Sequence, residues 1–144
     1  MHQNKEIDNI NSPSHYISGR RIEPIDVIEE FNLCYHTGCV VKYISRAGRK
    51  GSALEDLYKA EWYLKREIEI CDTDSDCFNR PRHRKHYSIR EILEDWDIKD
   101  DLNKCMFLLL SSKLTDLEIY RDKLIDSFHH LNQSIKDYQT NASE

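Results

Sequence analysis

Residues 42–52 read KYISRAGRKGS, and they predict a helix end, a tight turn and the start of a second helix. Gly48 and Gly51 suit the turn because glycine lacks a Cβ and adopts backbone angles that strain other residues. Ser52 is a good N-cap for the second helix, and Glu55 three residues later completes the sequence pattern of a capping box. The stretch therefore predicts two successive helices in a chain that we expect to be all-α.

The same stretch is strongly basic in a chain that is acidic as a whole. Lys42, Arg46 and Arg49 recur at positions i, i+4 and i+7, which places them on one helical face, and Lys50 follows in the turn. Residues 32–53 contain these four cations and no acidic residue, although the net charge of the chain is -5. Backbone N–H groups at a helix start and arginine side chains both bind phosphate oxygens. We therefore predict a phosphate site at this basic turn, with a solvated face paired to acidic helices as the alternative.

Length and composition indicate one soluble, helix-rich domain. The 144 residues are 33% charged and 39% hydrophobic, and only four glycines and three prolines argue against an all-β fold rich in turns. The negative net charge disfavours binding to extended nucleic acid. The sequence shows no secretory signal pattern, no apolar run long enough for a membrane span, and five cysteines without a CxxC pair. We therefore expect a cytoplasmic protein with free thiols and no membrane partner.

The chain divides into two helical regions joined by a linker. Residues 1–11 are polar and are expected to form a disordered tail. Residues 12–70 are predicted to form an N-terminal three-helix unit that carries the site, and residues 88–138 to form C-terminal helices that pack on it or on a second subunit. Residues 71–87 change from acidic to basic around Pro81 and are interpreted as the linker. The predicted helices cover about residues 24–33, 36–47, 53–70, 89–96, 100–111 and 114–138.

The two halves resemble one three-helix pattern used twice. Residues 28–33 (IEEFNL) match residues 93–98 (LEDWDI) in chemical class at every position, and residues 54–57 (LEDL) match residues 114–117 (LTDL). In the second half, residues 111–113 (SSK) replace the basic turn. We interpret this as a degenerate internal repeat, and chance agreement between amphipathic helices is the alternative. If the repeat is real, we expect the chemistry in the first half and packing in the second.

The third predicted helix carries further candidates. Glu61 falls within its apolar stripe, and a carboxylate there is costly unless it is paired, so Arg46 or Lys42 is its predicted partner. Trp62 lies at the border of the stripe with Tyr58, where the two rings could stack on a nucleobase. The alternative for Trp62 is an ordinary place in the hydrophobic core.

Histidines and cysteines offer two weaker candidates. His15 and Tyr16 lie in an extended segment, and a histidine near a phosphate could donate a hydrogen bond or transfer a proton. A structural role for this pair is the alternative. A second group could hold zinc only with spacings that fit no usual finger, so no metal site is predicted there. Its members are Cys71, Cys77, His83 and His86.

Four sequence blocks between residues 13 and 68 stand in a distinctive order. They are PSHY (13–16), IEPIDVIE (22–29), KYISRAGRKG (42–51) and EDLYKAEWYL (55–64). In this order the blocks resemble a small domain family found mostly in bacteriophage genomes, most members of which have no known function. The family is similar to the domain in the nucleotide kinase of short-tailed coliphages, which lacks a P-loop and phosphorylates deoxynucleoside monophosphates. The resemblance implies a phage or prophage protein, acting in a prokaryotic or virus-infected cell, that binds a nucleotide and transfers a phosphoryl group.

The leading hypothesis is therefore a phage-derived nucleotide-binding protein that phosphorylates deoxynucleoside monophosphates. In this hypothesis Glu55 or Asp56 holds Mg²⁺ or orients the acceptor. The extended His-Tyr segment closes over the nucleotide, and Trp62 or Tyr63 stacks on its base. The predicted catalytic residues are Glu55, Asp56 and His15, and the predicted nucleotide-binding residues are Lys42, Arg46, Arg49, Lys50, Ser52, Tyr16, Lys59, Trp62 and Tyr63.

Two other functions fit the same sequence features. A non-catalytic oligomer that sequesters a nucleotide or a nucleotide second messenger needs the basic turn, but it needs no carboxylate that activates an acceptor. A helical adaptor could use the basic turn to dock on a host protein. For the first two functions the expected partner is a nucleotide or another phosphate-bearing small molecule, and we expect a homo-oligomer.

Overall fold

The computed structural model describes residues 20–71 and 87–142. Within these ranges the chain is built from α-helices without a β-strand, which confirms the prediction of an all-α fold. The predicted tail at 1–11, the candidates His15 and Tyr16 and nearly all of the predicted linker lie outside the described residues. The helices are α2 (Pro24–Glu30), α3 (Tyr35–Arg46), α4 (Ala53–Ile70), α5 (Ile89–Asp95), α6 (Asp100–Ser112) and α7 (Leu117–Ala142).

Caps and turns set the helix boundaries. α4 covers the predicted residues 53–70, because Ser52 caps its start. α2 ends three residues before its predicted end, because the chain leaves the helix and turns at Asn32 with a φ of 48°. α7 begins three residues later than predicted, since the carbonyl of Asp116 accepts its first helical bond, from the N–H of Tyr120 at 3.0 Å. It also continues four residues past its predicted end.

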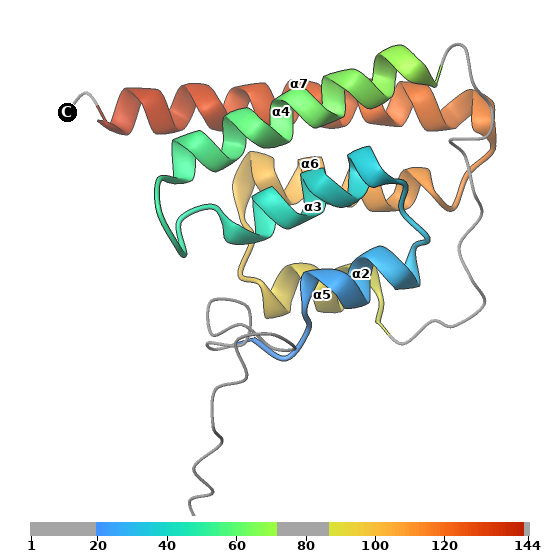
Figure 1. Cartoon of the computed structure of the whole chain (residues 1–144), viewed down its shortest axis with the longest axis horizontal. Helices are drawn as coiled ribbons and strands as arrows, with labels where there is room; N and C mark the ends of the chain where they lie inside the picture. The colour runs from blue at the N-terminus through green and yellow to red at the C-terminus, as the bar shows by residue number, and fades with distance from the viewer. Residues whose placement is uncertain (1–19, 72–86, 143–144) are drawn as a thin grey trace, which may run out of the picture.

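The helices form three antiparallel pairs stacked in three layers (Figure 1). α4 lies beside α7 in one outer layer, α3 beside α6 in the middle, and α2 with α5 in the other outer layer. Each layer therefore contains one helix from each half of the chain. The C-terminal helices thus pack on the N-terminal unit of the same chain.

The same helix cap recurs in the two halves, 65 residues apart. After α2, the N–H of Leu33 donates to the carbonyl of Ile28 at 3.0 Å. After α5, the N–H of Ile98 donates to the carbonyl of Leu93 at 3.1 Å. The residue before each donor, an asparagine in one half and an aspartate in the other, has a positive φ of 48° or 52°. Both helices also begin with a capping box, so the local geometry agrees with an internal repeat.

Hydrogen bonds join α5 to the segment that precedes α2. Nε1 of Trp96, whose ring is buried, donates to the carbonyl of Ile22 at 2.7 Å. The carboxylate of Asp95 accepts the backbone N–H groups of Arg21 at 3.1 Å and of Ile22 at 2.8 Å. A buried carbonyl without a donor is costly, so these bonds fix the start of the first half against the second.

Both halves contribute to one hydrophobic core. The buried apolar side chains include Val27, Val40, Val41, Ile44, Leu57, Leu64, Ile92, Met106, Leu109, Leu124 and Leu131.

Within the described ranges, every helix is too short or too polar to span a bilayer. The cysteines of these ranges are free thiols, as expected: Cys34, Cys39, Cys71 and Cys105.

Replacing Trp96 with phenylalanine tests the link between the halves. Trp96→Phe removes the donor to the Ile22 carbonyl and leaves a small cavity, so we expect the free energy of unfolding to fall by about 2 kcal/mol. Trp62→Phe is the matched control, because Trp62 is largely exposed, and its effect should stay within about 0.5 kcal/mol. Urea denaturation followed by circular dichroism measures both. Equal stability of the two variants would contradict the role of Trp96.

Candidate functional site

The basic turn joins α3 to α4 through the two predicted glycines. Gly48 and Gly51 have φ angles of 81° and 70°, a conformation that strains any residue with a Cβ. Oγ of Ser52 accepts the N–H of Glu55 at 3.3 Å, as predicted for an N-cap. The carboxylate of Glu55 lies 3.3 Å from Nζ of Lys59, so it pairs along the helix instead of completing the predicted capping box.

Arg46 pairs with a buried carboxylate next to this turn. Its Nε lies 3.6 Å from Oδ1 of Asp56, a residue only 3% exposed. Neither Arg46 Nε nor Asp56 Oδ2 has a hydrogen-bond partner among the described residues. Burial raises the pKa of Asp56, and the charge of Arg46 partly opposes that rise. The prediction that Arg46 pairs with Glu61 is therefore wrong, because Asp56 is the carboxylate that α4 buries against α3.

This pairing changes what the predicted site residues can do. Asp56 is turned into the protein, so Glu55 is the one of the two predicted carboxylates that faces solvent. Arg46 neutralises Asp56, which leaves less of its charge for an external phosphate. Lys42, Arg49 and the adjoining Lys50 are exposed.

Cations and aromatic rings share one face of α3 and α4. The amines of Lys42 and Lys59 lie 5.7 and 5.6 Å from the centroid of the Tyr43 ring. At these distances an ammonium group is attracted to an aromatic face. Tyr43 stacks on Tyr63 with 5.9 Å between ring centroids and an interplanar angle of 16°. We call this surface the cation–aromatic face, and it consists of Tyr35, Lys42, Tyr43, Lys59, Trp62 and Tyr63.

The aromatic end of this face is open to solvent. Trp62 packs edge-on against Tyr63 with 5.0 Å between centroids, and Tyr35 does the same at 5.9 Å. Trp62 is 61% exposed, so the alternative that places it in the core is wrong. Tyr58 is also exposed, and its hydroxyl accepts a hydrogen bond from Gln139 of α7. The predicted stacking residues Trp62 and Tyr63 therefore lie together at the surface.

A buried polar cluster lies where α3 begins. Glu67 of α4 is 0% exposed, and its Oε2 accepts a hydrogen bond from Sγ of Cys34 at 3.1 Å. The same oxygen lies 3.4 Å from Nδ1 of His36. Oε1 of Glu67 accepts a hydrogen bond from the hydroxyl of Tyr120 at 3.5 Å. Lys113 at the end of α6 is 2% exposed and interacts electrostatically with Glu67, which compensates the buried charge.

Burial shifts the pKa values of Cys34 and Lys113 in this cluster. The sequence did not predict the cluster. Burial raises the pKa of the Cys34 thiol to about 11, so the thiol is protonated at neutral pH. Burial lowers the pKa of Lys113, against the opposing effects of Cys34 and Glu67. The cluster draws on four helices or their caps, which no local pattern reveals. One signal was present, since Glu67 follows Ala60 and Leu64 at helical spacing on the buried side of α4.

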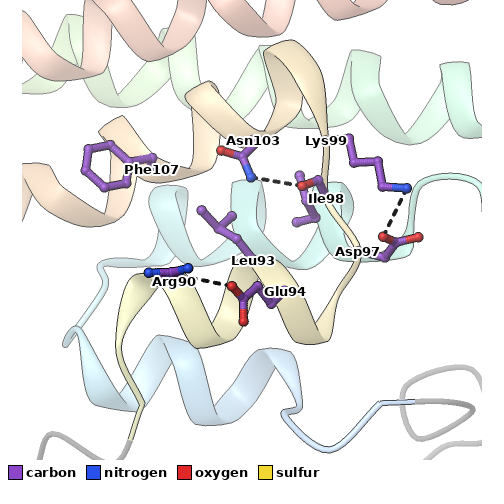
Figure 2. A pocket seen from close by; sticks show the side chains of 8 residues that line it. All are labelled: Arg90, Leu93, Glu94, Asp97, Ile98, Lys99, Asn103 and Phe107. Carbon is purple, nitrogen blue, oxygen red and sulfur yellow. Dashed lines mark hydrogen bonds and ion pairs between the residues drawn. The ribbon is translucent and has the colours of Figure 1, made fainter.

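An apolar pocket lies between α5 and α6 (Figure 2). It measures about 450 Å³, and Leu93, Ile98 and Phe107 line it. Because these residues belong to the second half, the pocket is separate from the basic turn in sequence. Two ion pairs lie beside it, Arg90–Glu94 at 3.0 Å and Lys99–Asp97 at 3.4 Å.

A second pocket, of about 430 Å³, reaches from the end of α3 to α6 and α7. Arg20 lines it, and burial and the charge of Arg49 lower the pKa of Arg20 to about 10. Within the described part of the chain, the predicted nucleotide-binding residues line neither of these two pockets. Four aspartates give the second pocket an acidic lining: Asp97, Asp100, Asp101 and Asp137.

Residues 10–65 match the model of one protein family. The family is DUF3310, a family of unknown function. The match covers fewer than half of the 144 residues and includes α2, α3, the basic turn and most of α4. No curated protein and no solved structure matches the chain. The matched region thus carries the whole cation–aromatic face, and its link to a phage nucleotide kinase stays a prediction.

Removing Arg46 tests the buried ion pair. Arg46→Ala leaves the Asp56 carboxylate buried without its charge partner, so we expect the free energy of unfolding at neutral pH to fall by about 2 kcal/mol. Arg49→Ala removes an exposed cation of the same turn and should change it by less than about 0.5 kcal/mol. Chemical denaturation measures both variants.

The cost of Arg46→Ala should also depend on pH. Burial raises the folded-state pKa of Asp56 above 3.8, and without Arg46 this pKa rises further. The charged carboxylate therefore destabilises the variant most at neutral pH, and the difference from the wild type shrinks as the pH falls toward 3.8. A difference that stays constant over this range would argue against the pair.

Proposed function

We propose that this protein binds a nucleotide on the cation–aromatic face. One observation carries the proposal: the amines of Lys42 and Lys59 lie 5.7 and 5.6 Å from the Tyr43 ring, which stacks on the partly buried ring of Tyr63, and Tyr63 in turn contacts the exposed ring of Trp62. A nucleotide has the matching pair of features, a flat base and a charged phosphate, at a fixed separation. Stacking surfaces next to cations are how proteins bind single nucleotides and single strands.

The aromatic end of the face suits the base. The exposed Trp62 and Tyr35 both pack edge-on against Tyr63, so each presents a ring face that Tyr63 does not cover. A base that stacks on such a ring gains about 1–3 kcal/mol. The basic end suits the phosphate, because the exposed side chains of Lys42 and Lys59 both lie beside the Tyr43 ring.

Arg46 has a different role in this proposal from the phosphate binding that its sequence position suggests. Since it pairs with the buried Asp56, it positions the start of α4 against the end of α3. Through this pair it fixes the turn and the amides after Ser52, which are the groups that a phosphate would meet at the helix start. Arg46 is therefore a positioning residue in this proposal.

Phosphoryl transfer to a deoxynucleoside monophosphate is the catalytic form of the proposal. Glu55 is the exposed carboxylate next to Lys59, so it would orient the acceptor or hold Mg²⁺, whereas Asp56 is buried and paired with Arg46. His15 and Tyr16 keep their predicted part of closing over the nucleotide. A phage or prophage origin and a homo-oligomer belong to the same proposal.

Binding without turnover is the second candidate, and the burial of Asp56 favours it. A kinase has to neutralise and orient two phosphorylated substrates, often with a metal ion held by carboxylates. Here one of the two predicted carboxylates is committed to an internal ion pair. A protein that sequesters a nucleotide or a nucleotide second messenger needs the cations and the rings alone.

A nucleotide panel tests the proposal directly. We expect mono-, di- or triphosphates to raise the melting temperature of the full chain and to release or absorb heat in calorimetry, with stabilisation that grows with ligand concentration. Inorganic phosphate and free nucleosides are the controls for the two ends of the face. If the full panel, with and without Mg²⁺, gives neither a shift nor heat, the proposal is wrong, and the adaptor hypothesis, which predicts this result, is the one left to test.

Trp62→Ala tests the stacking end. We expect it to weaken nucleotide binding by tenfold or more, since about 1–3 kcal/mol of stacking is lost, while circular dichroism stays unchanged. Phe107→Ala removes an exposed ring from the second half and should leave the affinity as it is. Calorimetry measures the dissociation constants. Equal nucleotide affinity of the wild type and Trp62→Ala would show that the base does not stack on Trp62.

Glu55→Gln separates transfer from sequestration. If the protein is a kinase, this substitution should lower the rate of ADP formation from ATP and a deoxynucleoside monophosphate by about a hundredfold or more, because the group that orients the acceptor loses its charge. Nucleotide affinity should change little. Glu61→Gln is the control on the same helix. A wild-type protein that binds nucleotides without forming ADP is the sequestering form.

A further inference from the structure

Three side chains of the buried polar cluster are of the types that bind metal ions. The Cys34 thiol, the Nδ1 atom of His36 and a carboxylate oxygen of Glu67 all lie within 4.8 Å of one another. Sulfur, imidazole nitrogen and carboxylate oxygen together suit Zn²⁺ and similar transition-metal ions, whereas Mg²⁺ prefers oxygen alone. We propose that Cys34, His36 and Glu67 form a binding site for a divalent transition-metal ion, with Zn²⁺ as the ion that fits best.

Two of the three distances between these atoms are close to those of a tetrahedral site, and the third is within 4.8 Å. Bonds of about 2.3 Å to sulfur and about 2.0 Å to nitrogen and oxygen place neighbouring ligand atoms about 3.3–3.5 Å apart. In this protein Sγ of Cys34 and Nδ1 of His36 lie 3.1 and 3.4 Å from the same oxygen of Glu67. The three side chains therefore need only small movements to meet around one ion.

The surrounding groups hold the ligands in place. Glu67 projects from the buried side of α4 near the end of the helix, and the Tyr120 hydroxyl donates to its second oxygen at 3.5 Å. Cys34 is the N-cap residue of α3, and its sulfur lies 3.2 Å from Oγ1 of Thr37. Such outer hydrogen bonds orient metal ligands and are part of most protein metal sites.

The site has a route to solvent and room in its coordination. His36 is partly exposed, and its ring lies beside those of Tyr35 and Tyr63, with centroids 5.7 and 6.3 Å away. An ion can therefore enter past His36, at the edge of the cation–aromatic face. Three protein ligands leave a fourth tetrahedral position for water, as in zinc sites that are not purely structural.

Charge balance follows from the groups present. When the ion binds, the Cys34 thiol releases its proton to solvent and the thiolate bonds to the metal, so the thiolate and the Glu67 carboxylate together offset the two charges of the ion and Lys113 is left as one excess cation. Without an ion, Lys113 is the cation that offsets Glu67. The competing interpretation is a purely structural hydrogen-bond network around Glu67 and Lys113. The proposal does not depend on nucleotide binding, because it rests on different side chains.

Cobalt titration tests the site in the full chain. After dialysis against a chelator, Co²⁺ should bind with one-to-one stoichiometry and give thiolate-to-metal absorption and the visible bands of a tetrahedral ion, and Zn²⁺ should displace it. Cys34→Ser should lose the thiolate band, and His36→Gln should weaken Co²⁺ binding at least tenfold. Cys39→Ser lies on the same helix outside the cluster, and Cys77→Ser tests the other cysteine group of the sequence, so both should behave as the wild type.

Melting temperature and circular dichroism distinguish a loss of metal binding from a loss of folding. Zn²⁺ should raise the melting temperature of the wild type and of Cys39→Ser but not of Cys34→Ser, because only a ligand of the folded state stabilises it. Circular dichroism without metal verifies that each variant is folded. A wild type without thiolate-to-cobalt absorption overturns the proposal whatever the variants do. A thiolate-to-cobalt band that survives Cys34→Ser also overturns the proposal, as does a band that disappears in Cys77→Ser.

Discussion

A carboxylate inside a protein has to be compensated, and α4 buries two of them. Near the start of the helix, Asp56 has Arg46 of α3 as its charge partner. Near the end, Glu67 has Lys113 from the end of α6 and the hydroxyl of Tyr120 from α7. Leaving a buried charge without its partner costs about 2–5 kcal/mol, less where the partner is partly exposed as Arg46 is, and this is a large part of the stability of a small domain. These partners come from three other elements, so they fix both the position and the rotation of α4.

The rotation of α4 about its own axis determines which of its side chains are exposed. With Asp56, Ala60, Leu64 and Glu67 turned inward, helical spacing turns Trp62 outward and keeps it beside Tyr63, the ring that contacts the tyrosines of α3. The cation–aromatic face is therefore a consequence of internal electrostatics. His36 belongs to the buried polar cluster through its 3.4 Å approach to Glu67, and its ring also lies beside Tyr63 of the cation–aromatic face, so the two features share a border.

Local signals in the sequence predicted the local structure. The two glycines of the basic turn, the N-cap serine before α4 and the capping pattern before α5 act within a few residues of chain, and each has the predicted geometry. These signals fixed the existence of the helices and most of their boundaries. The candidate site was predicted less completely, because its properties depend on residues far apart in the sequence.

Three features of the site show why. The charge partner of Arg46 depends on which side of α4 faces α3, and helical spacing alone favoured Glu61 over Asp56. The exposure of Trp62 depends on how far the neighbouring helix covers the border of an apolar stripe. The buried polar cluster joins Cys34 to Lys113, 79 residues later in the chain, through the fold alone.

The paired caps at the ends of α2 and α5 bear on how this protein arose. Two three-helix units that lie antiparallel, layer by layer, are what duplication and fusion of one ancestral gene would produce from a symmetric dimer. A shorter chain with only the first unit would leave uncovered the sides of α3 and α4 that α6 and α7 cover here. If the repeat is real, such a chain would cover these sides by pairing with an identical copy, and the pair would carry two cation-rich bends where this chain has one.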